Sequence, residues 1–322
     1  MDQATLTVLV VSRSDDPVLA ALREAGPGVE FVVGEHAGAL AEAAPRGQAI
    51  LALSGDRDTL EGVFAIAPRV RWVHSWATGV DGFLFPALVE SDAVLTNTRG
   101  VYSGSLAEFA IGAMLYFAKD FARMKRSQRA QVWDPFDVAM LSGATLGIVG
   151  YGDIGRAVAT LGHAAGMNIL ALRRRPELSR ADPLGPEMVT SKGAICERSD
   201  YLVLAAPLTP ETRHLIGREE LRAMRRSAVL VNIGRGPLVD QAALVSALER
   251  HALKGAALDV FEREPLPPGD PLFRLDNVLL SPHCADHTAT WRDDAMRCFV
   301  DNLTRFRAGK PLENVIDKAN GY

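Results

Sequence analysis

A glycine-rich turn between an apolar run and a helical pattern constrains this chain most strongly. Gly150-Tyr-Gly152-Asp-Ile-Gly155 follows the buried-strand pattern Leu146–Val149 and opens a helix predicted over Asp153–Ala165. Gly150 permits a tight turn, Gly152 lets the backbone approach a pyrophosphate, and Gly155 lets helix and strand pack closely. A chain with 28 glycines contains such spacings by chance, so the flanking strand and helix carry the inference of a dinucleotide site.

The end of the next predicted strand, Asn168–Leu172, indicates which dinucleotide binds. In NAD sites an acidic residue about 20 residues after the glycine turn binds the ribose hydroxyls. Here Arg173, Arg174 and Arg175 follow Leu172 instead. Guanidinium groups suit the 2′-phosphate of NADP, which is nearly dianionic and accepts a forked donor. We therefore expect NADP (NADPH) to be preferred over NAD; the alternative is that these arginines only coat a surface.

Short apolar runs alternate with helical patterns along the chain, which predicts an α/β fold. The strands predicted for the first region are Thr5–Val11, Phe31–Val33, Ala49–Leu53, Val70–His74 and Val94–Thr96. Those predicted for the second are Leu146–Val149, Asn168–Leu172, Tyr201–Ala205, Ala228–Asn232, Ala256–Val260 and Val278–Ser281. We expect two Rossmann-like or flavodoxin-like domains, each a parallel sheet flanked by helices, with a cleft between them.

The longest helical patterns set the expected domain boundaries. The pattern from Ala289 to about Ala308 follows the last strand, so we expect it to return to the first domain. The substrate-binding domain is then discontinuous, residues 1–99 plus 286–322, and the dinucleotide-binding Rossmann domain is 100–285. A further helix is predicted over Pro237–Glu249, between two strands of the second domain.

One helix predicted from Ser103 to about Arg126 is apolar over a broad surface. It either bridges the two domains or lies in the interface of a homodimer, which we expect this protein to form. Trp133 and Phe136 follow it in a loop. These aromatic side chains either pack at that interface or reach a neighbouring site.

Composition excludes several other classes of protein. The formal net charge is -4 and no long basic run is present, so we expect no binding to nucleic acid. Cys196, Cys284 and Cys298 are too widely spaced for a disulfide framework or a metal site, so no metal is expected. No apolar stretch approaches the roughly 18 residues of a membrane span, and the first residues lack a signal-peptide pattern. We expect a cytoplasmic protein that does not bind membranes.

Three later segments each follow a predicted strand of the second domain. They are Val231-Asn-Ile-Gly-Arg235-Gly-Pro-Leu-Val-Asp240, Ala257-Leu-Asp259-Val-Phe-Glu262-Arg-Glu264-Pro265 and Ser281-Pro282-His283-Cys-Ala285. Ligands of an open parallel sheet bind where its strands end. An arginine, two acids and a histidine that are far apart in sequence are therefore expected to converge at that edge.

Together with the glycine turn, these segments resemble the D-isomer-specific 2-hydroxyacid dehydrogenase family, in particular its NADP-dependent glyoxylate/hydroxypyruvate reductase-like members. The resemblance covers most of the chain. It extends to Thr78-Gly-Val-Asp81, to Thr96-Asn-Thr-Arg-Gly-Val-Tyr-Ser103 with Ala107-Glu108, and to Pro207-Leu-Thr-Pro-Glu-Thr-Arg213. Matches in this order are specific for the family but do not identify one substrate.

The resemblance implies a role for each polar residue. Arg235 binds a 2-oxo acid and polarises its carbonyl, and His283 donates the proton as hydride arrives from the nicotinamide. Glu264 orients His283 and favours its protonated form, while Asp259 faces the nicotinamide amide. The implied cofactor contacts are Gly150, Gly152, Asp153, Ile154, Gly155, Arg173, Arg174, Pro207, Thr212, Ile233, Gly234, Asp259, His283 and Ala285. The implied substrate contacts are Trp76, Thr78, Gly79, Val80, Arg235 and His283, with backbone amides of residues 78–80 on the substrate carboxylate.

The chemistry agrees with those roles. A carbonyl that accepts hydride develops negative charge on its oxygen, so a positive group and a proton donor must be placed there beforehand. Histidine titrates near neutrality and a neighbouring carboxylate raises its pKa, so His283 can give and retake the proton. Reduction should therefore slow as pH rises past the pKa of His283. Arg235 stands between Gly234 and Gly236, which we expect to let a backbone turn aim it inward.

Alternatives remain for several residues. His287 is four residues from His283 and is its rival as proton donor. Glu262 and Glu264 are both candidates for solvated loop acids, and Asp259 for a helix cap. Cys284 either fills a small buried space or lines the site with a reactive thiol. Trp76 either walls the substrate pocket or packs between domains.

The function expected from these residues is reduction of a small 2-oxo acid such as glyoxylate or hydroxypyruvate to the D-2-hydroxy acid by NADPH. Bulkier aromatic or branched 2-oxo acids are the first alternative. A dinucleotide-sensing binding protein of the same fold is the second, and the presence of Arg235, Glu264 and His283 argues against it. A dehydrogenase of an unusual donor such as formate or phosphite is the third, and nothing in the substrate loop favours it.

Overall fold

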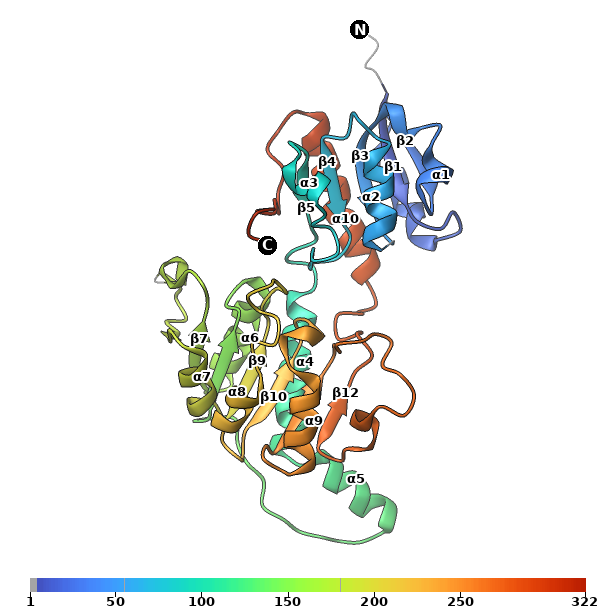
Figure 1. The fold of residues 1–322 in the computed structure, drawn as a ribbon. Helices are drawn as coiled ribbons and strands as arrows, with labels where there is room; N and C mark the ends of the chain where they lie inside the picture. Colours follow the sequence, from blue (N-terminus) through green and yellow to red (C-terminus); the bar gives the residue numbers. More distant parts are fainter. Residues whose placement is uncertain (1–4, 55, 180) are drawn as a thin grey trace. The chain divides into compact units, whose positions relative to one another are not determined.

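The computed structural model describes residues 5–54, 56–179 and 181–322. The chain divides into two compact units (Figure 1): unit 1 is Met1–Tyr102 with Thr288–Tyr322, and unit 2 is Ser103–His287. The sequence placed these divisions after residues 99 and 285. The C-terminal segment is part of unit 1, together with the first strands of the chain.

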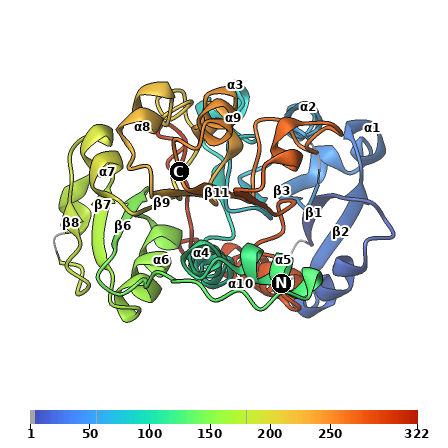
Figure 2. The same ribbon diagram turned by 90° about the horizontal axis from the view of Figure 1, so that it is seen from below.

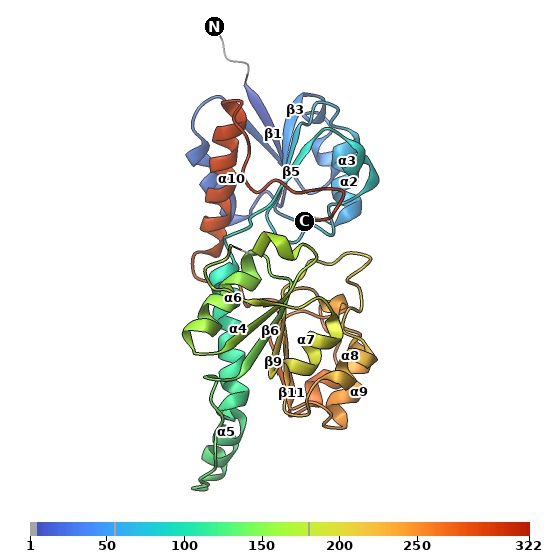
Figure 3. The ribbon, with the colours of Figure 1, turned by 90° about the vertical axis from the view of Figure 1, so that its left-hand side faces the viewer.

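Unit 1 contains a five-stranded parallel sheet in the order β2-β1-β3-β4-β5. Its strands are β1 Leu6–Val11, β2 Val29–Gly34, β3 Gly47–Ala52, β4 Trp72–Ser75 and β5 Val94–Thr96. Its helices are η1 Pro17–Ala25, α1 Ala37–Leu40, η2 Ala44–Arg46, α2 Arg57–Ala65, α3 Pro86–Glu90 and α10 Trp291–Arg307. Figure 3 shows α10 on one face of the sheet and α2 and α3 on the other.

Side chains of β1 belong alternately to two cores, one on each face of this sheet. Leu9 and Val11 pack in the core that includes Leu60 of α2, while Val8 and Val10 pack in the one that includes Phe299 of α10. A strand buried on both faces needs apolar side chains at every position. This is why the strand pattern in the sequence is a continuous apolar run rather than an alternating one.

Unit 2 contains a seven-stranded parallel sheet in the order β12-β11-β10-β9-β6-β7-β8. Its strands are β6 Thr145–Val149, β7 Asn168–Leu172, β8 Glu187–Met188, β9 Tyr201–Leu204, β10 Val229–Asn232, β11 Gly255–Leu258 and β12 Val278–Leu280. Its helices are α4 Ser103–Ala118, α5 Phe121–Ala130, α6 Asp153–Ala164, η3 Pro176–Ser179, α7 Lys192–Arg198, α8 Arg218–Ala223, η4 Gly236–Leu238, α9 Gln241–Glu249 and η5 Pro271–Arg274. Figure 2 shows α4 and α6 on one face of the sheet and α7, α8 and α9 on the other.

The register of this sheet aligns the last residues of six strands in one row. Neighbouring strands pair these residues in the order Leu172, Val149, Leu204, Asn232, Leu258, Leu280. The residues that follow each strand therefore lie along one edge, which we call the carboxyl edge. The chain connections change direction between β6 and β9, and this is where open α/β sheets bind ligands.

The prediction of one helix from Ser103 to about Arg126 is wrong. The structure has two helices, α4 and α5, and Asp120 between them has a left-handed backbone with φ of 51°. The Asp120 carboxylate accepts a hydrogen bond from the amide of Arg123 at 3.1 Å and so caps α5. Likewise the helix predicted from Pro237 begins at Gln241, after η4, because Asp240 caps it.

Helix α5 and the loop 131–140, which we call the arm, stand away from the sheet of unit 2 (Figures 1 and 3). The side chain of Arg123 holds the loop to the helix with two hydrogen bonds to Asp134, at 2.8 and 3.0 Å, and its guanidinium lies 4.3 Å from the ring centre of Phe136. The Lys119 ammonium donates to the carbonyl of Ala139 at 2.7 Å and holds the far end of the loop. The arm therefore has a defined shape although α5 has no buried residue.

The described residues contain neither a membrane-spanning helix nor a metal-binding group. Within residues 5–54, 56–179 and 181–322, no helix is both long and apolar enough to cross a membrane. In the same part of the chain, no three His, Cys, Asp or Glu side chains are grouped so that they would hold a metal ion.

Candidate active site

The glycine turn joins β6 to α6 at the carboxyl edge. Gly150 has a φ of 92°, and a Cβ on it would lie 2.5 Å from the backbone nitrogen of Ala206. A Cβ on Gly155 would lie 2.2 Å from the carbonyl oxygen of Gly150. A Cβ on Gly152 would meet nothing within 4 Å. Two of the glycines thus close the turn tightly, and the third leaves open space beside the backbone, where a pyrophosphate fits.

The first turn of α6 offers backbone amides for that pyrophosphate. Gly152 is the N-cap of the helix and no side chain caps it, so the amides of Asp153 and Ile154 belong to an uncapped helix start. The carboxylate of Asp153 accepts a hydrogen bond from the hydroxyl of Ser103 at the start of α4. A contact of Asp153 with a dinucleotide would therefore come from its backbone rather than its side chain.

Arg173 and Arg174 follow β7, the neighbour of β6, and Leu172 pairs with Val149 directly before the glycine turn. Arg173 is half-buried and its Nη1 donates to the hydroxyl of Ser179 at 2.8 Å, whereas Arg174 is exposed. The register therefore places the two arginines beside the phosphate turn. An ADP-ribose bound there would have its 2′-position within their region of the edge.

The remaining predicted cofactor contacts follow β9, β10 and β12. The hydroxyl of Thr212 donates to the carbonyl of Pro207 at 2.7 Å, which closes the loop after β9. After β10, Ile233 is buried, and the amide of Gly234 donates to the Asn232 side chain at 3.1 Å. After β12, the carbonyl of Ala285 accepts a hydrogen bond from the Ser105 hydroxyl at 2.6 Å. No pattern in the sequence predicts this contact of Ser105 with Ala285.

His283 and Glu264 form a hydrogen-bonded pair at the carboxyl edge. Nδ1 of His283 lies 2.7 Å from Oε2 of Glu264, and the other carboxylate oxygen of Glu264 accepts the amide of Phe261 at 2.9 Å. Both side chains are partly exposed, at 45% for His283 and 35% for Glu264. The carboxylate therefore holds the imidazole through Nδ1, and Nε2 is the ring nitrogen that could transfer a proton to a substrate.

Charge around this pair favours the protonated imidazole. The hydrogen bond that His283 donates to Glu264 raises the pKa of His283, against the lowering effects of burial and of the charge on Arg235. Burial on its own would raise the pKa of Glu264, but the hydrogen bonds from His283 and the Phe261 amide lower it below its usual value. With an ionised Glu264 beside it, a histidine of raised pKa can donate a proton near neutral pH.

Arg235 follows β10, and its positive charge lowers the pKa of Glu264 as well as that of His283. Its carbonyl accepts the side-chain amide of Asn232 at 2.9 Å. Arg235 itself has extended backbone, and a Cβ on Gly236 would lie 1.8 Å from the carbonyl carbon of Phe261. The turn expected beside Arg235 is η4, which begins at Gly236, and the close packing of two backbones there leaves room only for a glycine.

A buried carboxylate holds the loop that carries His283. Oδ1 of Asp259, a residue that is 1% exposed, accepts hydrogen bonds from the Ser281 hydroxyl at 2.6 Å and from the amides of Cys284 and Ala285 at 2.9 and 3.1 Å. The amide of His283 donates to the carbonyl of Asp259 at 2.9 Å. Asp259 thus ties β11 to the segment after β12, and it is not a helix cap.

The structure separates the rival residues. Oε1 of Glu262 lies 2.8 Å from Nε2 of His214, so Glu262 pairs with a different histidine from Glu264. Nε2 of His287 lies 3.7 Å from Asp286, farther than His283 is from Glu264. Cys284 is exposed, with its sulfur 3.5 Å from the Ser281 hydroxyl oxygen, so the interpretation of Cys284 as a small buried filler is wrong.

The predicted substrate loop follows β4 in unit 1. The ring of Trp76 meets the ring of Trp291 edge-on at 5.1 Å between centroids, and its carbonyl accepts the hydroxyls of Thr98 and Tyr102 at 2.7 and 2.9 Å. The carbonyl of Thr78 accepts the side-chain amide of Asn97 at 2.6 Å, and Val80 is buried. Trp76, Thr78, Gly79 and Val80 are therefore held in a fixed loop, and Trp76 packs on aromatic neighbours of its own unit.

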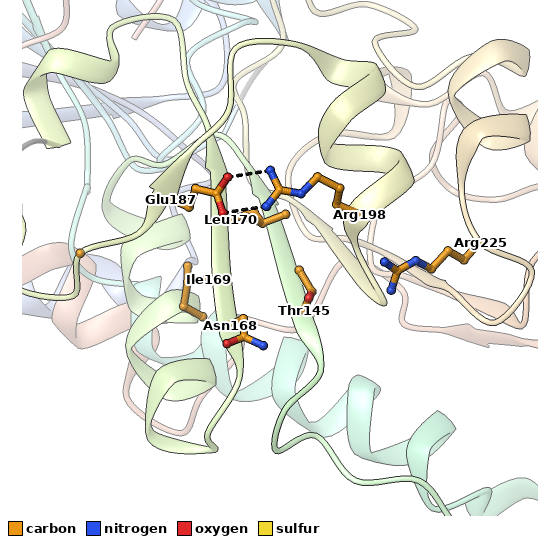
Figure 4. A pocket seen from close by; sticks show the side chains of 8 residues that line it. Thr145, Asn168, Ile169, Leu170, Glu187, Arg198 and Arg225 are labelled. Carbon is orange, nitrogen blue, oxygen red and sulfur yellow. Dashed lines mark hydrogen bonds and ion pairs between the residues drawn. The ribbon is translucent and has the colours of Figure 1, made fainter.

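An open pocket of about 450 Å³ lies at the opposite edge of the unit 2 sheet, where β6 and β7 begin. Figure 4 shows Arg198 facing Glu187 across it, and the two side chains form hydrogen bonds of 2.6 and 2.7 Å. The second arginine in the pocket, Arg225, pairs with Asp200 at 2.5 Å. Both charges are compensated and the glycine turn is at the other edge, so this pocket is not part of the candidate site.

Comparison with known proteins decides the family. The model of the NAD-binding domain of the D-isomer-specific 2-hydroxyacid dehydrogenases matches residues 111–285. The chain belongs to this family. It is an NAD(P)-binding oxidoreductase, which confirms the dinucleotide site predicted from the glycine turn and the activity implied by the resemblance.

Relatives of this dehydrogenase cover nearly all of the chain. The glyoxylate reductase of Korarchaeum cryptofilum is 39% identical over 264 residues, which are 80% of this chain and 79% of that enzyme. A family member from Xanthobacter autotrophicus, solved with NADPH and MES, has a TM-score of 0.83 and 30% identity and covers 99% of this chain and 100% of its own. The NADPH-dependent glyoxylate/hydroxypyruvate reductase of Sinorhizobium meliloti, solved with NADP and malonate, has a TM-score of 0.81 and 29% identity over 98% and 97%.

The pair of His283 and Glu264 predicts the pH dependence of reduction. His283→Gln should lower kcat by about 10²- to 10⁴-fold, the contribution of a general acid. In Glu264→Gln the neutral amide no longer stabilises the imidazolium, so the pKa of His283 should fall. The rate of reduction should then decline at lower pH than in the wild type. The measurement is kcat against pH for 2-oxo acid reduction in the three proteins.

His287→Gln is the matched control, because its ring lies in the same loop without the short contact to Glu264. It should keep the rate and pH profile of the wild type. Near-normal turnover of His283→Gln, together with slow turnover of His287→Gln, would show that His287 is the proton donor.

Proposed function

We propose that this dehydrogenase reduces a small 2-oxo acid, such as glyoxylate or hydroxypyruvate, to the corresponding D-2-hydroxy acid with NADPH. The observation that carries the proposal is the 2.7 Å contact between His283 and Glu264, at the same sheet edge as the glycine turn and Arg235. A proton donor, a cation and a dinucleotide turn at one edge are what reduction of a carbonyl requires.

Each residue of the proposed site has one role in the reduction. Bound NADPH supplies the hydride that adds to the carbonyl carbon of the substrate. The guanidinium of Arg235 binds the 2-oxo acid and stabilises the negative charge that grows on the carbonyl oxygen. His283 transfers its proton to that oxygen, and Glu264 stabilises the imidazolium before transfer and holds the ring afterwards. The family resemblance assigns the substrate carboxylate to backbone amides of residues 78–80.

Asp259 would contribute in two ways. Its Oδ1 is occupied by Ser281, Cys284 and Ala285, so this oxygen fixes the loop after β12. The family resemblance assigns Asp259 a contact with the nicotinamide amide, which would be made by the other oxygen. The carboxylate would then position both the hydride donor and the proton donor.

The preference for NADPH rests on Arg173 and Arg174. The three residues directly after β7 are arginines and none is acidic, and each guanidinium can form charge-assisted hydrogen bonds to a 2′-phosphate. Two relatives support the preference, since the Xanthobacter protein was solved with NADPH and the Sinorhizobium enzyme with NADP. The names of the Korarchaeum and Sinorhizobium enzymes favour a small substrate.

A panel of 2-oxo acids with both reduced cofactors tests the function. Glyoxylate and hydroxypyruvate should give higher kcat/KM than phenylpyruvate or branched 2-oxo acids. NADPH should give a kcat/KM at least about tenfold higher than NADH, because hydrogen bonds to a charged group contribute roughly 1.5–3 kcal/mol. Hydroxypyruvate should yield D-glycerate, identified by chiral chromatography.

Each result of the panel excludes a competitor. Oxidation of neither cofactor by any 2-oxo acid, with tight NADPH binding, would leave a dinucleotide-sensing protein. A higher kcat/KM for the bulky acids would overturn the proposed substrate class, and a ratio that favours NADH would overturn the proposed cofactor.

We also infer that two copies of this chain form a homodimer through the arm. Trp133 is 96% exposed and Met140 is 69% exposed, while Arg123 and Lys119 hold the loop that carries them. A rigid loop that presents large apolar side chains outward matches a protein interface rather than a solvated surface. This assignment gives Trp133 the interface role that the sequence left open.

Trp133→Ser should weaken the dimer. A central tryptophan of an interface contributes about 2 kcal/mol or more, so the dimer dissociation constant should rise at least about 30-fold. Sedimentation velocity over a dilution series measures it. Arg218→Ala, an exposed change on α8 and outside the arm, is the control and should leave the constant within a few-fold of the wild type. A monomeric wild type, or an unchanged constant in Trp133→Ser, would contradict the inference.

A further inference from the structure

Asp182, in the connection between β7 and β8, has a nearly buried carboxylate with three hydrogen-bond donors. Its side chain is 8% exposed. Arg156 Nε donates at 2.7 Å and the Tyr151 hydroxyl at 3.2 Å to Oδ2, and the amide of Leu184 donates at 3.0 Å to Oδ1. We call Tyr151, Arg156 and Asp182 the clasp. A carboxylate this deep needs such compensation, and the proposed chemistry does not use it.

The clasp connects two parts of the proposed cofactor site. Tyr151 is the residue between Gly150 and Gly152, and Arg156 lies one turn into α6, the helix that opens at that turn. Tyr151 thus belongs to the phosphate turn and Arg156 to the helix that follows it. Asp182 belongs to the segment that follows the arginines after β7. The clasp therefore fixes the segment after β7 against the phosphate turn.

Arg173 is coupled to the clasp through Ser179, which accepts a backbone hydrogen bond from Asp182. The amide of Asp182 donates to the carbonyl of Ser179 at 3.1 Å. Ser179 is 5% exposed, and its hydroxyl accepts the hydrogen bond of 2.8 Å from Arg173 Nη1. A free arginine side chain would lose rotamer entropy on binding a phosphate. Fixing Arg173 in advance through Ser179 removes part of that cost.

Charge in the clasp also matters, because a carboxylate near a 2′-phosphate repels it. Burial would raise the pKa of Asp182, but the hydrogen bonds from Arg156 and the Leu184 amide lower it, so the carboxylate is ionised at neutral pH. Burial, and after it the charge of Asp182, raises the pKa of Tyr151 to about 12, so the phenol keeps its proton and donates it. Arg156 is the group that offsets the negative charge.

We propose that Tyr151 and Arg156, acting through Asp182, are positioning residues that select NADPH: they hold Arg173 in place for the 2′-phosphate and neutralise the carboxylate beside it. This rests on the proposed preference for NADPH. Only NADPH carries the group that Arg173 meets. Loss of the clasp should therefore weaken NADPH binding and leave NADH binding unchanged, whereas a general loss of structure would weaken both.

The test is the dissociation constant of NADPH and of NADH, measured by protein fluorescence quenching for each variant. Arg156→Gln leaves Asp182 uncompensated and should weaken NADPH about tenfold, with NADH within twofold of the wild type. Tyr151→Phe removes one hydrogen bond and should weaken NADPH about threefold. Arg156→Lys keeps the charge and should recover most of the lost affinity. Adenosine 2′,5′-bisphosphate should follow NADPH, and adenosine 5′-monophosphate should follow NADH.

Arg198→Gln is the matched control. Arg198 also makes two hydrogen bonds to a carboxylate, that of Glu187, but at the opposite edge of the same sheet (Figure 4). It should change neither dissociation constant. Equal weakening of NADPH and NADH in Arg156→Gln would reduce the clasp to a structural role and overturn the proposal.

The two proposals fail in different ways. A wild type that binds NADPH more tightly, together with an Arg156→Gln variant of the same selectivity, would overturn the clasp alone. A wild type that binds NADH more tightly would overturn the cofactor preference and the clasp with it.

Discussion

The register of the seven-stranded sheet is the constraint on which the candidate site depends. Leu172, Val149, Leu204, Asn232, Leu258 and Leu280 lie in one row, so the chain leaves each of six strands at the same edge. The next residues along the chain include Gly150, Arg173 and Asp259. A shift of one strand by one residue would move its last side chain to the other face and displace whatever follows it. Apolar burial of the strands therefore also sets the geometry of the chemistry.

One loop at this edge is held in an unfavourable backbone conformation. His283 has a φ of 52°, a left-handed value that few residues other than glycine adopt and that costs on the order of 1–3 kcal/mol. The three hydrogen bonds to Oδ1 of Asp259 and the bond from the His283 amide to the Asp259 carbonyl offset that cost. They turn the imidazole toward Glu264, which then sets its pKa. The same buried acid thus holds the loop of His283, the proposed proton donor, and Glu264 raises the pKa of its imidazole.

Much of this arrangement was predictable from the sequence. The strand ends, the glycine turn and the basic residues after β7 are local patterns, and a parallel sheet brings them together without further information. Glu262 and Glu264 were not separable in this way. Each follows β11 within a few residues, and only the observed pairing of Glu262 with His214 leaves Glu264 for His283.

Other features left no local signal. The break between α4 and α5 depends on the left-handed Asp120, and β8 is two residues long with no apolar pattern. Asp182 is 26 residues from Arg156, and nothing in its neighbourhood in the sequence predicts that pairing. These features arise from tertiary contacts, so a pattern of residues alone does not contain them.

In the proposed mechanism a protonated His283, held by Glu264, is positioned to donate its proton to the carbonyl oxygen of the substrate. The most direct measurement is the dissociation constant of oxamate, an analogue that does not accept hydride, from the NADPH complex as a function of pH. Above the pKa of His283 the constant should rise about tenfold per pH unit, because each binding event must first take up one proton. A dissociation constant that does not change with pH across that range would contradict the account.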